Sequence, residues 1–198
     1  MPGKLHLLCA AAVGVVALAL PASAEELRQK ISATRVIDLT HPLYDAMAFW
    51  PGGVPFKKTR LVDYDQGYQL HKFEMGENTG THVDAPSHFI KGNLPIDKLA
   101  LRDIVVPAVV IDVKDQVAGN ADYQLSGAVG VGIDTLSLDF GPSKDFAFHV
   151  AMLKANKYQI ENMANLDALP ATGATVIVAV LPIQEGSQAQ ARILALLP

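Results

Sequence analysis

The sequence predicts an α/β or α+β domain built on a mixed β-sheet. Two apolar stretches, residues 105–113 and 174–181, have the length and composition of buried strands. Only one segment, residues 145–157, shows clear helical periodicity together with a length suited to a helix. A chain in which strands outnumber helices favours a sheet with few covering helices over a helical bundle.

The predicted elements before residue 80 are short. Residues 25–33 carry acidic residues early and a lysine late, as in a short amphipathic helix. Residues 35–39 predict a buried strand that ends at a His-Pro pair. Residues 45–67 are rich in glycine, proline and aromatic residues, which predicts an irregular arm, and residues 68–76 show strand alternation.

The second half of the chain supplies most of the predicted sheet. Residues 105–113 are apolar except for Pro107 and Asp112, as in a strand buried on both faces with proline near its start. Residues 129–133 predict a short strand with alternating glycines. Residues 174–181 predict the strongest strand, which a proline ends, and residues 192–197 predict a terminal strand.

In the predicted helix, residues 145–157, three apolar side chains have the spacing of a single face. They are Phe146, Val150 and Leu153, at positions i, i+4 and i+7. We therefore expect this face to pack against the sheet.

The N-terminus resembles a secretory signal. Lys4 precedes an apolar run over residues 5–20, and the small residues at 21–24 form a cleavage pattern. The run is short for a bilayer span and lacks a stop-transfer flank. We expect residues 1–24 to be a signal peptide and the mature protein to be periplasmic or secreted. A retained N-terminal anchor is the alternative.

Residues 25–198 have a length that fits one domain with one hydrophobic core. Cys9 is the single cysteine and leaves with the signal, so stability depends on packing, metal or oligomerisation rather than a disulfide. The 16 basic and 20 acidic residues give a net charge of −4, and the basic ones are scattered. We expect no nucleic-acid partner and no membrane contact after signal cleavage.

Residues 78–88, Asn-Thr-Gly-Thr-His-Val-Asp-Ala-Pro-Ser-His, concentrate the polar chemistry of the chain. In a strand, His82 and Asp84 point to the same side, and an imidazole with a carboxylate suits a divalent metal. Pro86 ends the strand, and the turn it makes can bring His88 over the same point as a proton carrier. The alternative is a polar turn with half-buried, hydrogen-bonded histidines.

This run resembles the signature of the metal-dependent cyclase-like hydrolases, which include bacterial kynurenine formamidase and isatin hydrolase. Their pattern, His-x-Gly-Thr-His-x-Asp-x-Pro-x-His, is matched at every position except the first, where the chain has Asn78. Further blocks resemble the family in the same order. They are residues 38–43, 50–52 and 132–139, and the pair His149 and Glu161 with Asn162 following. The resemblance implies the swivelling β/β/α, barrel-like cyclase fold.

His149 and Glu161 are twelve residues apart, too far to share one helix face. They converge only if the chain reverses near residues 156–157. Taken alone, His149 is more often a core or surface helix residue, and Glu161 is more often solvated.

The resemblance implies a role for each matched residue. His82 and Asp84 would bind a first divalent metal, with Asn78 where the family has a third ligand. Asp84 can bridge to a second metal held by His149 and Glu161. The ion would be manganese or zinc, as one or two ions.

The remaining matched residues concern proton transfer and substrate. His88 corresponds to the general acid/base. Glu161 can take part in proton transfer if it is not a metal ligand. Trp50 matches a substrate-contacting tryptophan, whose flat face suits an aromatic ring, with ordinary packing as the alternative.

The function implied is hydrolysis of a small carbon–nitrogen acyl bond by an amidohydrolase of EC class 3.5. An arylformamidase acting on N-formylkynurenine, or an enzyme opening a cyclic amide such as isatin, fits the family. A bound divalent metal lowers the pKa of water and polarises the carbonyl. The resemblance also implies a homodimer or higher homo-oligomer.

Two departures from the family pattern leave alternatives open. Asn78 offers an amide oxygen, which favours manganese over zinc. Relatives carry several dozen further residues at a point near residues 126/127, so a segment is expected to be missing here. The alternatives are a catalytically weak or inactive exported paralogue that binds metal or a small aromatic ligand, and a structural domain whose polar loop only resembles a site.

Overall fold

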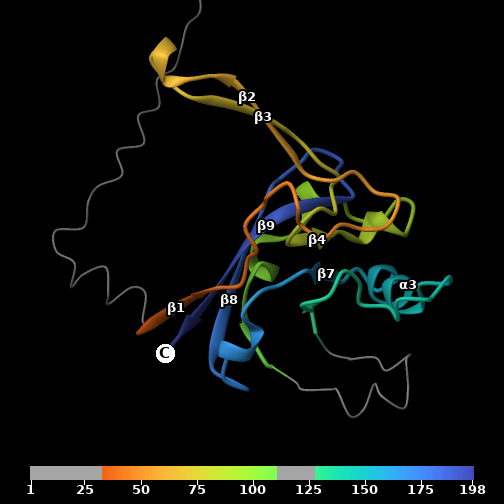
Figure 1. Cartoon of the computed structure of the whole chain (residues 1–198). Coiled ribbons are helices and arrows are strands. Elements are labelled where there is room, and N and C mark those ends of the chain that lie inside the picture. Colours follow the sequence, from red (N-terminus) through yellow and green to blue (C-terminus); the bar gives the residue numbers. More distant parts are fainter. Residues whose placement is uncertain (1–32, 111–127) are drawn as a thin grey trace, which may run out of the picture. The chain divides into compact units, whose positions relative to one another are not determined.

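A mixed β-sheet organises the computed structural model, which describes residues 33–110 and 128–198 (Figure 1). Its strands are β1 (Arg35–Asp38), β4 (His82–Asp84), β5 (Val105–Ala108), β6 (Gly130–Gly132), β7 (Tyr158–Glu161), β8 (Ala174–Val180) and β9 (Gln188–Leu197). The sheet has seven strands in the order β5-β8-β9-β4-β7-β6, and β1 pairs with β9. Only the β6–β7 pair is parallel in this sheet. The predicted class, a mixed sheet with few helices, is confirmed.

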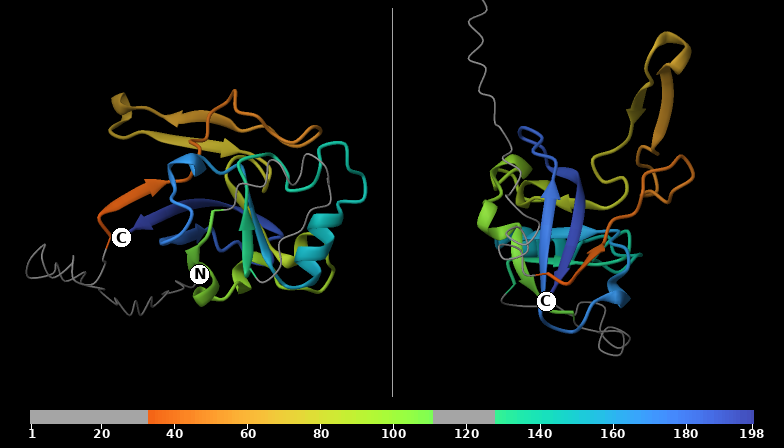
Figure 2. Two further views of the ribbon diagram at one scale, coloured as in Figure 1. Left: turned by 90° about the horizontal axis from the view of Figure 1, so that it is seen from below. Right: turned by 90° about the vertical axis from the view of Figure 1, so that its left-hand side faces the viewer.

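Strand β9 connects the two halves of the sheet. Its residues 191–197 pair with β8 or β1, and its first three residues pair with β4. The sheet curls, so the strands form a half-barrel around the core (Figure 2). This curvature matches the barrel-like fold that the resemblance to the cyclase-like hydrolases implied.

The core and the polar site occupy opposite faces of strands β4 and β7. Val83 and Ile160 point into the hydrophobic core, where Leu39 and Ile193 are also buried. Because side chains alternate along a strand, the neighbours of Val83, His82 and Asp84, point to the other face. Packing of the apolar face therefore determines where the polar side chains meet.

Strands β2 (Lys57–Val62) and β3 (Leu70–Glu74) form a separate antiparallel hairpin that extends away from the large sheet (Figure 2). Strand β3 was predicted, but residues 57–62 were expected to be part of an irregular arm. That expectation was wrong here because a well-defined turn pairs the strands. Asp63 caps the turn, and Gly67 closes it with a φ of 97°.

Strand β5 differs from its prediction. It was expected to be buried on both faces, but Val105 is 52 % exposed. The strand lies at the end of the sheet and pairs only with β8 among the described strands, so one edge lacks a neighbour. Pro107, which cannot donate a ladder hydrogen bond, suits such an edge position. Residues 111–113 lie outside the described residues.

Helix α3 (Ala147–Lys154) confirms the predicted helix and only part of its predicted buried face. Val150 is exposed, and Phe146 precedes the helix as its N-cap residue. The buried side chains are Phe148, His149, Met152 and Leu153. Leu153 of the predicted face is buried, but the buried face continues over Phe148 and Met152 and therefore carries His149 inward.

Short 3₁₀ helices complete the described chain: η1 (Tyr64–Gln66), η2 (Pro86–His88), η3 (Ile96–Lys98), η4 (Leu101–Asp103) and η5 (Leu166–Ala168). No helix in residues 33–110 or 128–198 is long and apolar enough to cross a membrane. The predicted signal peptide, the helix over residues 25–33 apart from its last residue, and the missing segment near residues 126/127 lie outside the described residues.

Candidate metal centre and active site

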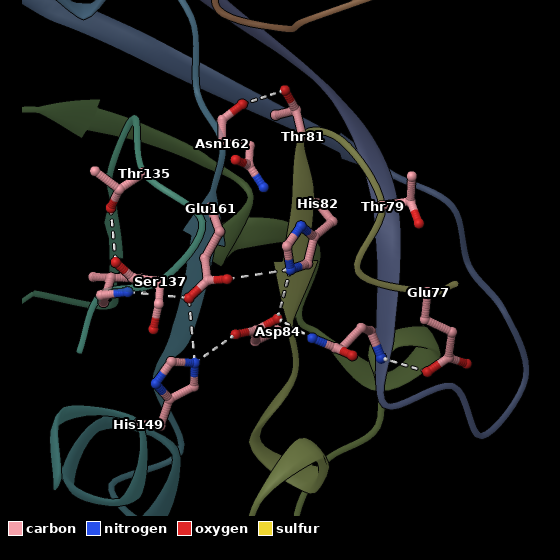
Figure 3. A network of polar contacts seen from close by, with 12 residues as sticks. Glu77, Thr79, Thr81, His82, Asp84, Thr135, Ser137, His149, Glu161 and Asn162 are labelled. Atoms are coloured by element: carbon pink, nitrogen blue, oxygen red, sulfur yellow. Dashed lines mark hydrogen bonds and ion pairs between the residues drawn. The ribbon is translucent and has the colours of Figure 1, made fainter. Parts of the chain in front are cut away.

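Two neighbouring strands and one helix bring four predicted side chains together (Figure 3). His82 and Asp84 lie on β4, and His82 is directly opposite Glu161 on the antiparallel strand β7. Helix α3 supplies His149 from the other side of the cluster. The structure therefore gathers residues that are up to 79 positions apart in the sequence, from His82 to Glu161.

The four side chains form a closed ring of alternating imidazoles and carboxylates. The Nε2 atom of His82 lies 3.2 Å from Asp84 Oδ1 and 3.5 Å from Glu161 Oε2. The Nε2 atom of His149 lies 3.3 Å from Asp84 Oδ2 and 3.2 Å from Glu161 Oε1. None of the four side chains is more than 6 % exposed.

A reversal of the chain after α3 makes this convergence possible. The helix ends at Lys154, Asn156 adopts a left-handed conformation with a φ of 57°, and β7 begins at Tyr158. Asparagine tolerates this conformation better than most residues. The reversal lies where the spacing of His149 and Glu161 required it.

The donor set of the ring fits a divalent cation. Two buried atoms that point into it, Nε2 of His82 and Oδ2 of Asp84, have only the contacts of 3.2–3.5 Å within the ring and no well-aligned hydrogen bond among the described residues. Two groups of three side chains have donor atoms within 4.8 Å of one another: Asp84 with His88 and His149, and His82 with Asp84 and Glu161. Asp84 belongs to both groups. Mixed imidazole and carboxylate donors are typical ligands of zinc and manganese.

Charges within the ring are strongly coupled when no cation is bound. Burial disfavours the charged imidazole of His149, but hydrogen bonds with Asp84, Glu161 and Asp139 outweigh it and raise the pKa to about 10. For His82, the hydrogen bond and charge of Asp84 likewise overcome burial and raise the pKa. A cation that binds here therefore displaces protons.

The two carboxyl groups respond in opposite directions. Burial favours the neutral form of Asp84, but hydrogen bonds from His149 and His82 prevail and lower its pKa. Burial dominates at Glu161 and raises its pKa, with the nearby charge of Asp84 adding to the effect. The environment thus favours one carboxylate that stays charged beside one that holds a proton more readily.

His88 belongs to η2 and is half-buried at the edge of the four-residue ring of His82, Asp84, His149 and Glu161. Its ring centroid lies 4.8 Å from that of Phe89 and 6.2 Å from that of His149. Burial is the main reason why its pKa is lowered. The neutral imidazole at neutral pH is the form that can accept a proton.

A cavity of about 250 Å³ opens beside the ring. Its lining comprises Trp50, Asn78, His88, Phe89, Leu136, Ser137, Phe146, His149, Glu161 and Gln188. Three of these side chains are large aromatics: the rings of Trp50 and Phe146 have centroids 6.2 Å apart, and those of Phe89 and Phe146 lie 5.4 Å apart. The cavity therefore combines an apolar aromatic wall with a polar floor.

Trp50 and Asn78 both line the cavity, as their positions in the motifs suggested. The Oδ1 atom of Asn78 lies 2.9 Å from the point where a side chain on Gly76 would begin. No hydrogen bond or ion pair joins Asn78 to the four-residue ring among the residues that the structure describes. Its role as a ligand, and that of Trp50 in substrate contact, stay predictions.

Two polar residues next to the ring were not singled out from the sequence. Gln188 is paired with Asp84 across β4 and β9, and its Nε2 donates to Asp84 Oδ1 over 2.7 Å. Asp139 accepts a hydrogen bond from Nδ1 of His149. Two features of the sequence could have identified these residues. Gln188 is a polar residue at the start of an apolar strand, and Asp139 is the acid that ends the block of residues 132–139.

Comparison with known proteins supports the fold and the motifs. The Cyclase family, described as a putative cyclase, matches residues 37–129. Kynurenine formamidase from Bacillus cytotoxicus is 35% identical over 85 residues, which are 42% of this chain and 41% of that protein. The enzyme of the same name from Bacillus anthracis is 32% identical over 87 residues, 43% and 42% of the two chains. The aligned segment thus spans about two fifths of these curated relatives.

The solved structures cover more of the chain. Isatin hydrolase A from Labrenzia aggregata, bound to benzyl benzoate, has a TM-score of 0.75 and 26% identity, covering 87% of this chain and 99% of that one. Isatin hydrolase A from Ralstonia solanacearum has a TM-score of 0.70 and 27% identity, covering 91% and 99%. The chain thus shares the fold of these two isatin hydrolases over most of its length. Residues 37–129 match the cyclase family, which the motifs of the sequence resemble.

Proposed function

We propose that this protein is a metal-dependent hydrolase of a small carbon–nitrogen acyl bond, an amidohydrolase of EC class 3.5. The observation that carries the proposal is the buried ring of His82, Asp84, His149 and Glu161, placed at an aromatic cavity. Its relatives named kynurenine formamidase and isatin hydrolase support the same reaction class.

The residues of the site divide the work of such a reaction. His82, Asp84, His149 and Glu161 would hold the cation. When bound, a divalent cation lowers the pKa of water and polarises a carbonyl oxygen. His88, neutral at neutral pH, accepts a proton and returns it to the leaving nitrogen, a step that contributes about 10²–10⁴-fold to the rate.

The substrate we propose is a small aromatic amide. The cavity of about 250 Å³ suits a small ligand, and Trp50, Phe89 and Phe146 present aromatic rings at its wall. Aromatic side chains favour offset or edge-on contact with a planar ring. An N-formylated aromatic amine such as N-formylkynurenine, or a cyclic amide such as isatin, meets these requirements.

Hydrolysis of isatin and N-formylkynurenine by protein loaded with Mn²⁺ or Zn²⁺ tests the proposal. Turnover of either compound is expected in the wild type and should fall about 10²–10⁴-fold in His88→Ala. His71→Ala, on the hairpin strand β3 and outside the cavity lining, is the matched control and should keep full activity. Wild-type protein that binds cation but hydrolyses neither compound would contradict the substrate assignment.

We propose manganese rather than zinc as the preferred cation, in one or two positions. Asn78 supplies an oxygen where relatives have an imidazole nitrogen, and Asp84 belongs to both possible ligand groups. Titration of cation-free wild type and Asn78→His with Mn²⁺ and Zn²⁺ tests this. Zinc affinity should rise in the variant; equal and tight zinc binding by both proteins would refute the reasoning.

A second candidate is a catalytically weak or inactive exported paralogue that binds metal or a small aromatic ligand. Asn78 favours it, since this side chain makes no hydrogen bond or ion pair with the four-residue ring within the described part of the chain. Under this alternative, cation binding and binding of a substrate analogue persist without turnover. The hydrolysis assay above separates the two candidates.

Assembly and location complete the proposal. The hairpin of β2 and β3 exposes Leu61, Tyr64 and Phe73, a pattern that supports a homodimer or higher homo-oligomer. Sedimentation analysis of the purified protein tests it. The signal-like residues 1–24 support a periplasmic or secreted single-domain protein comprising residues 25–198, shortened near residues 126/127. N-terminal sequencing of exported protein tests the cleavage.

A further inference from the structure

One carboxylate, that of Asp139, contacts both the start of helix α3 and the ring of His149. Its Oδ1 accepts the backbone N–H of Phe148 over 2.8 Å, and its Oδ2 accepts the backbone N–H of His149 over 3.1 Å. Oδ2 also accepts a hydrogen bond from Nδ1 of the His149 ring. The Asp139 side chain is only 6 % exposed, so water competes little for these contacts.

The capping role is unusual because the cap comes from outside the helix. Phe146 occupies the N-cap position and makes no side-chain capping bond. Asp139, seven residues earlier, satisfies instead the free N–H groups of the second and third helical residues. The backbone of His149 and its ring are therefore held by the same group.

The adjacent residues hold the opposite ligand. The backbone N–H of Leu138 donates to Oε1 of Glu161 over 3.1 Å, and the Asp139 N–H donates to Ser137 Oγ over 3.1 Å. Two consecutive residues, Leu138 and Asp139, thus bond to Glu161 and His149, and Ser137 holds the backbone of Asp139. In Figure 3 the chain at Ser137 lies beside Glu161.

We infer that Asp139 is a positioning residue for the second cation position, holding the Nδ1 proton of His149 so that Nε2 faces Asp84 and Glu161 as a free ligand. The inference rests on the proposed function, since it concerns the cation of that site. An imidazole can bind a cation through Nε2 only when its proton sits on Nδ1, and an acceptor at Nδ1 enforces this tautomer. Asp139 is the only group for which such a contact with Nδ1 of His149 is found among the described residues.

Asp139→Asn removes the negative charge of the acceptor with little change of shape. The amide has one acceptor oxygen in place of two, and this neutral oxygen holds the Nδ1 proton of His149 less strongly than the carboxylate does. We expect the variant to fold, with a melting temperature lowered by only a few degrees. The affinity for the second cation should fall about 10–100-fold, while the first cation, held by His82 and Asp84, keeps its affinity.

The experiment titrates cation-free protein with Mn²⁺ and with Zn²⁺ by calorimetry and measures bound metal. Asp145→Asn is the matched control, because Asp145 lies just before α3, is exposed and has a hydrogen bond only to Ser143 among the described side chains. Wild type and Asp145→Asn should bind alike. Equal affinity in Asp139→Asn would overturn the inference and leave the proposed function standing, whereas no binding by the wild type would overturn both.

A second measurement does not depend on folding of the variant. In zinc-loaded wild-type protein, the ¹⁵N resonances of His149 should show a proton on Nδ1 and a metal on Nε2. Zinc bound through Nδ1, or a proton on Nε2, would overturn the inference.

Discussion

In the cation-free protein, His149 should carry a proton well above neutral pH. Burial alone would lower its pKa, but the hydrogen bonds to Asp84, Glu161 and Asp139 raise it to about 10. A cation that uses Nε2 of His149 must displace this proton. Between pH 7 and about 10, the apparent affinity for that cation should therefore rise about tenfold per pH unit, or about a thousandfold over the three units.

Calorimetry measures both parts of this prediction. Mn²⁺ titrations at pH 7, 8 and 9 give the slope of affinity against pH, and repeats in buffers of different ionisation enthalpy give the number of protons released. At least about one proton should leave per cation bound at this position at pH 7. His149→Asn should lose the slope, and His71→Ala should keep it. Affinity that stays constant from pH 7 to 9, without proton release, would refute the charge model of the ring.

Three further predictions concern stability. The pKa of His149 in the folded protein lies above its ordinary value of 6.5. The stabilising effect of its charge is therefore complete below about pH 6.5 and is lost as pH rises toward about 10. The melting temperature of the cation-free protein should fall across that range. Asp84→Ala removes the carboxylate shared by both imidazoles. It should lower the free energy of unfolding in urea by about 3–5 kcal/mol and abolish cation binding. A decrease below about 1 kcal/mol would argue against the coupled ring. Phe146 has a φ of 48°, so Phe146→Gly should be about 1–2 kcal/mol more stable than Phe146→Ala, while both lose affinity for aromatic ligands equally; equal stability of the pair would show that the backbone is unstrained there.

Elements with strong local signals were predicted well. The strands at residues 174–181 and 129–133 and the helix near residues 145–157 correspond to β8, β6 and α3. The errors arose where pairing decided the outcome. The hairpin strand β2 depends on its partner β3, and the exposure of β5 depends on its place at the end of the sheet. Neither property is encoded in the composition of the segment itself.

For the site, the sequence by itself determined that His82 and Asp84 share a face, because alternation along a strand is a local property of the backbone. Only the tertiary structure decided that Glu161 lies opposite His82 and that α3 turns His149 toward both, since strand register and helix rotation follow from packing of the apolar core. The contacts of Asp139 and Gln188 were likewise decided only by the tertiary structure. They join residues 10 and 104 positions from their partners, and side-chain geometry at that separation exists only once the chain has folded.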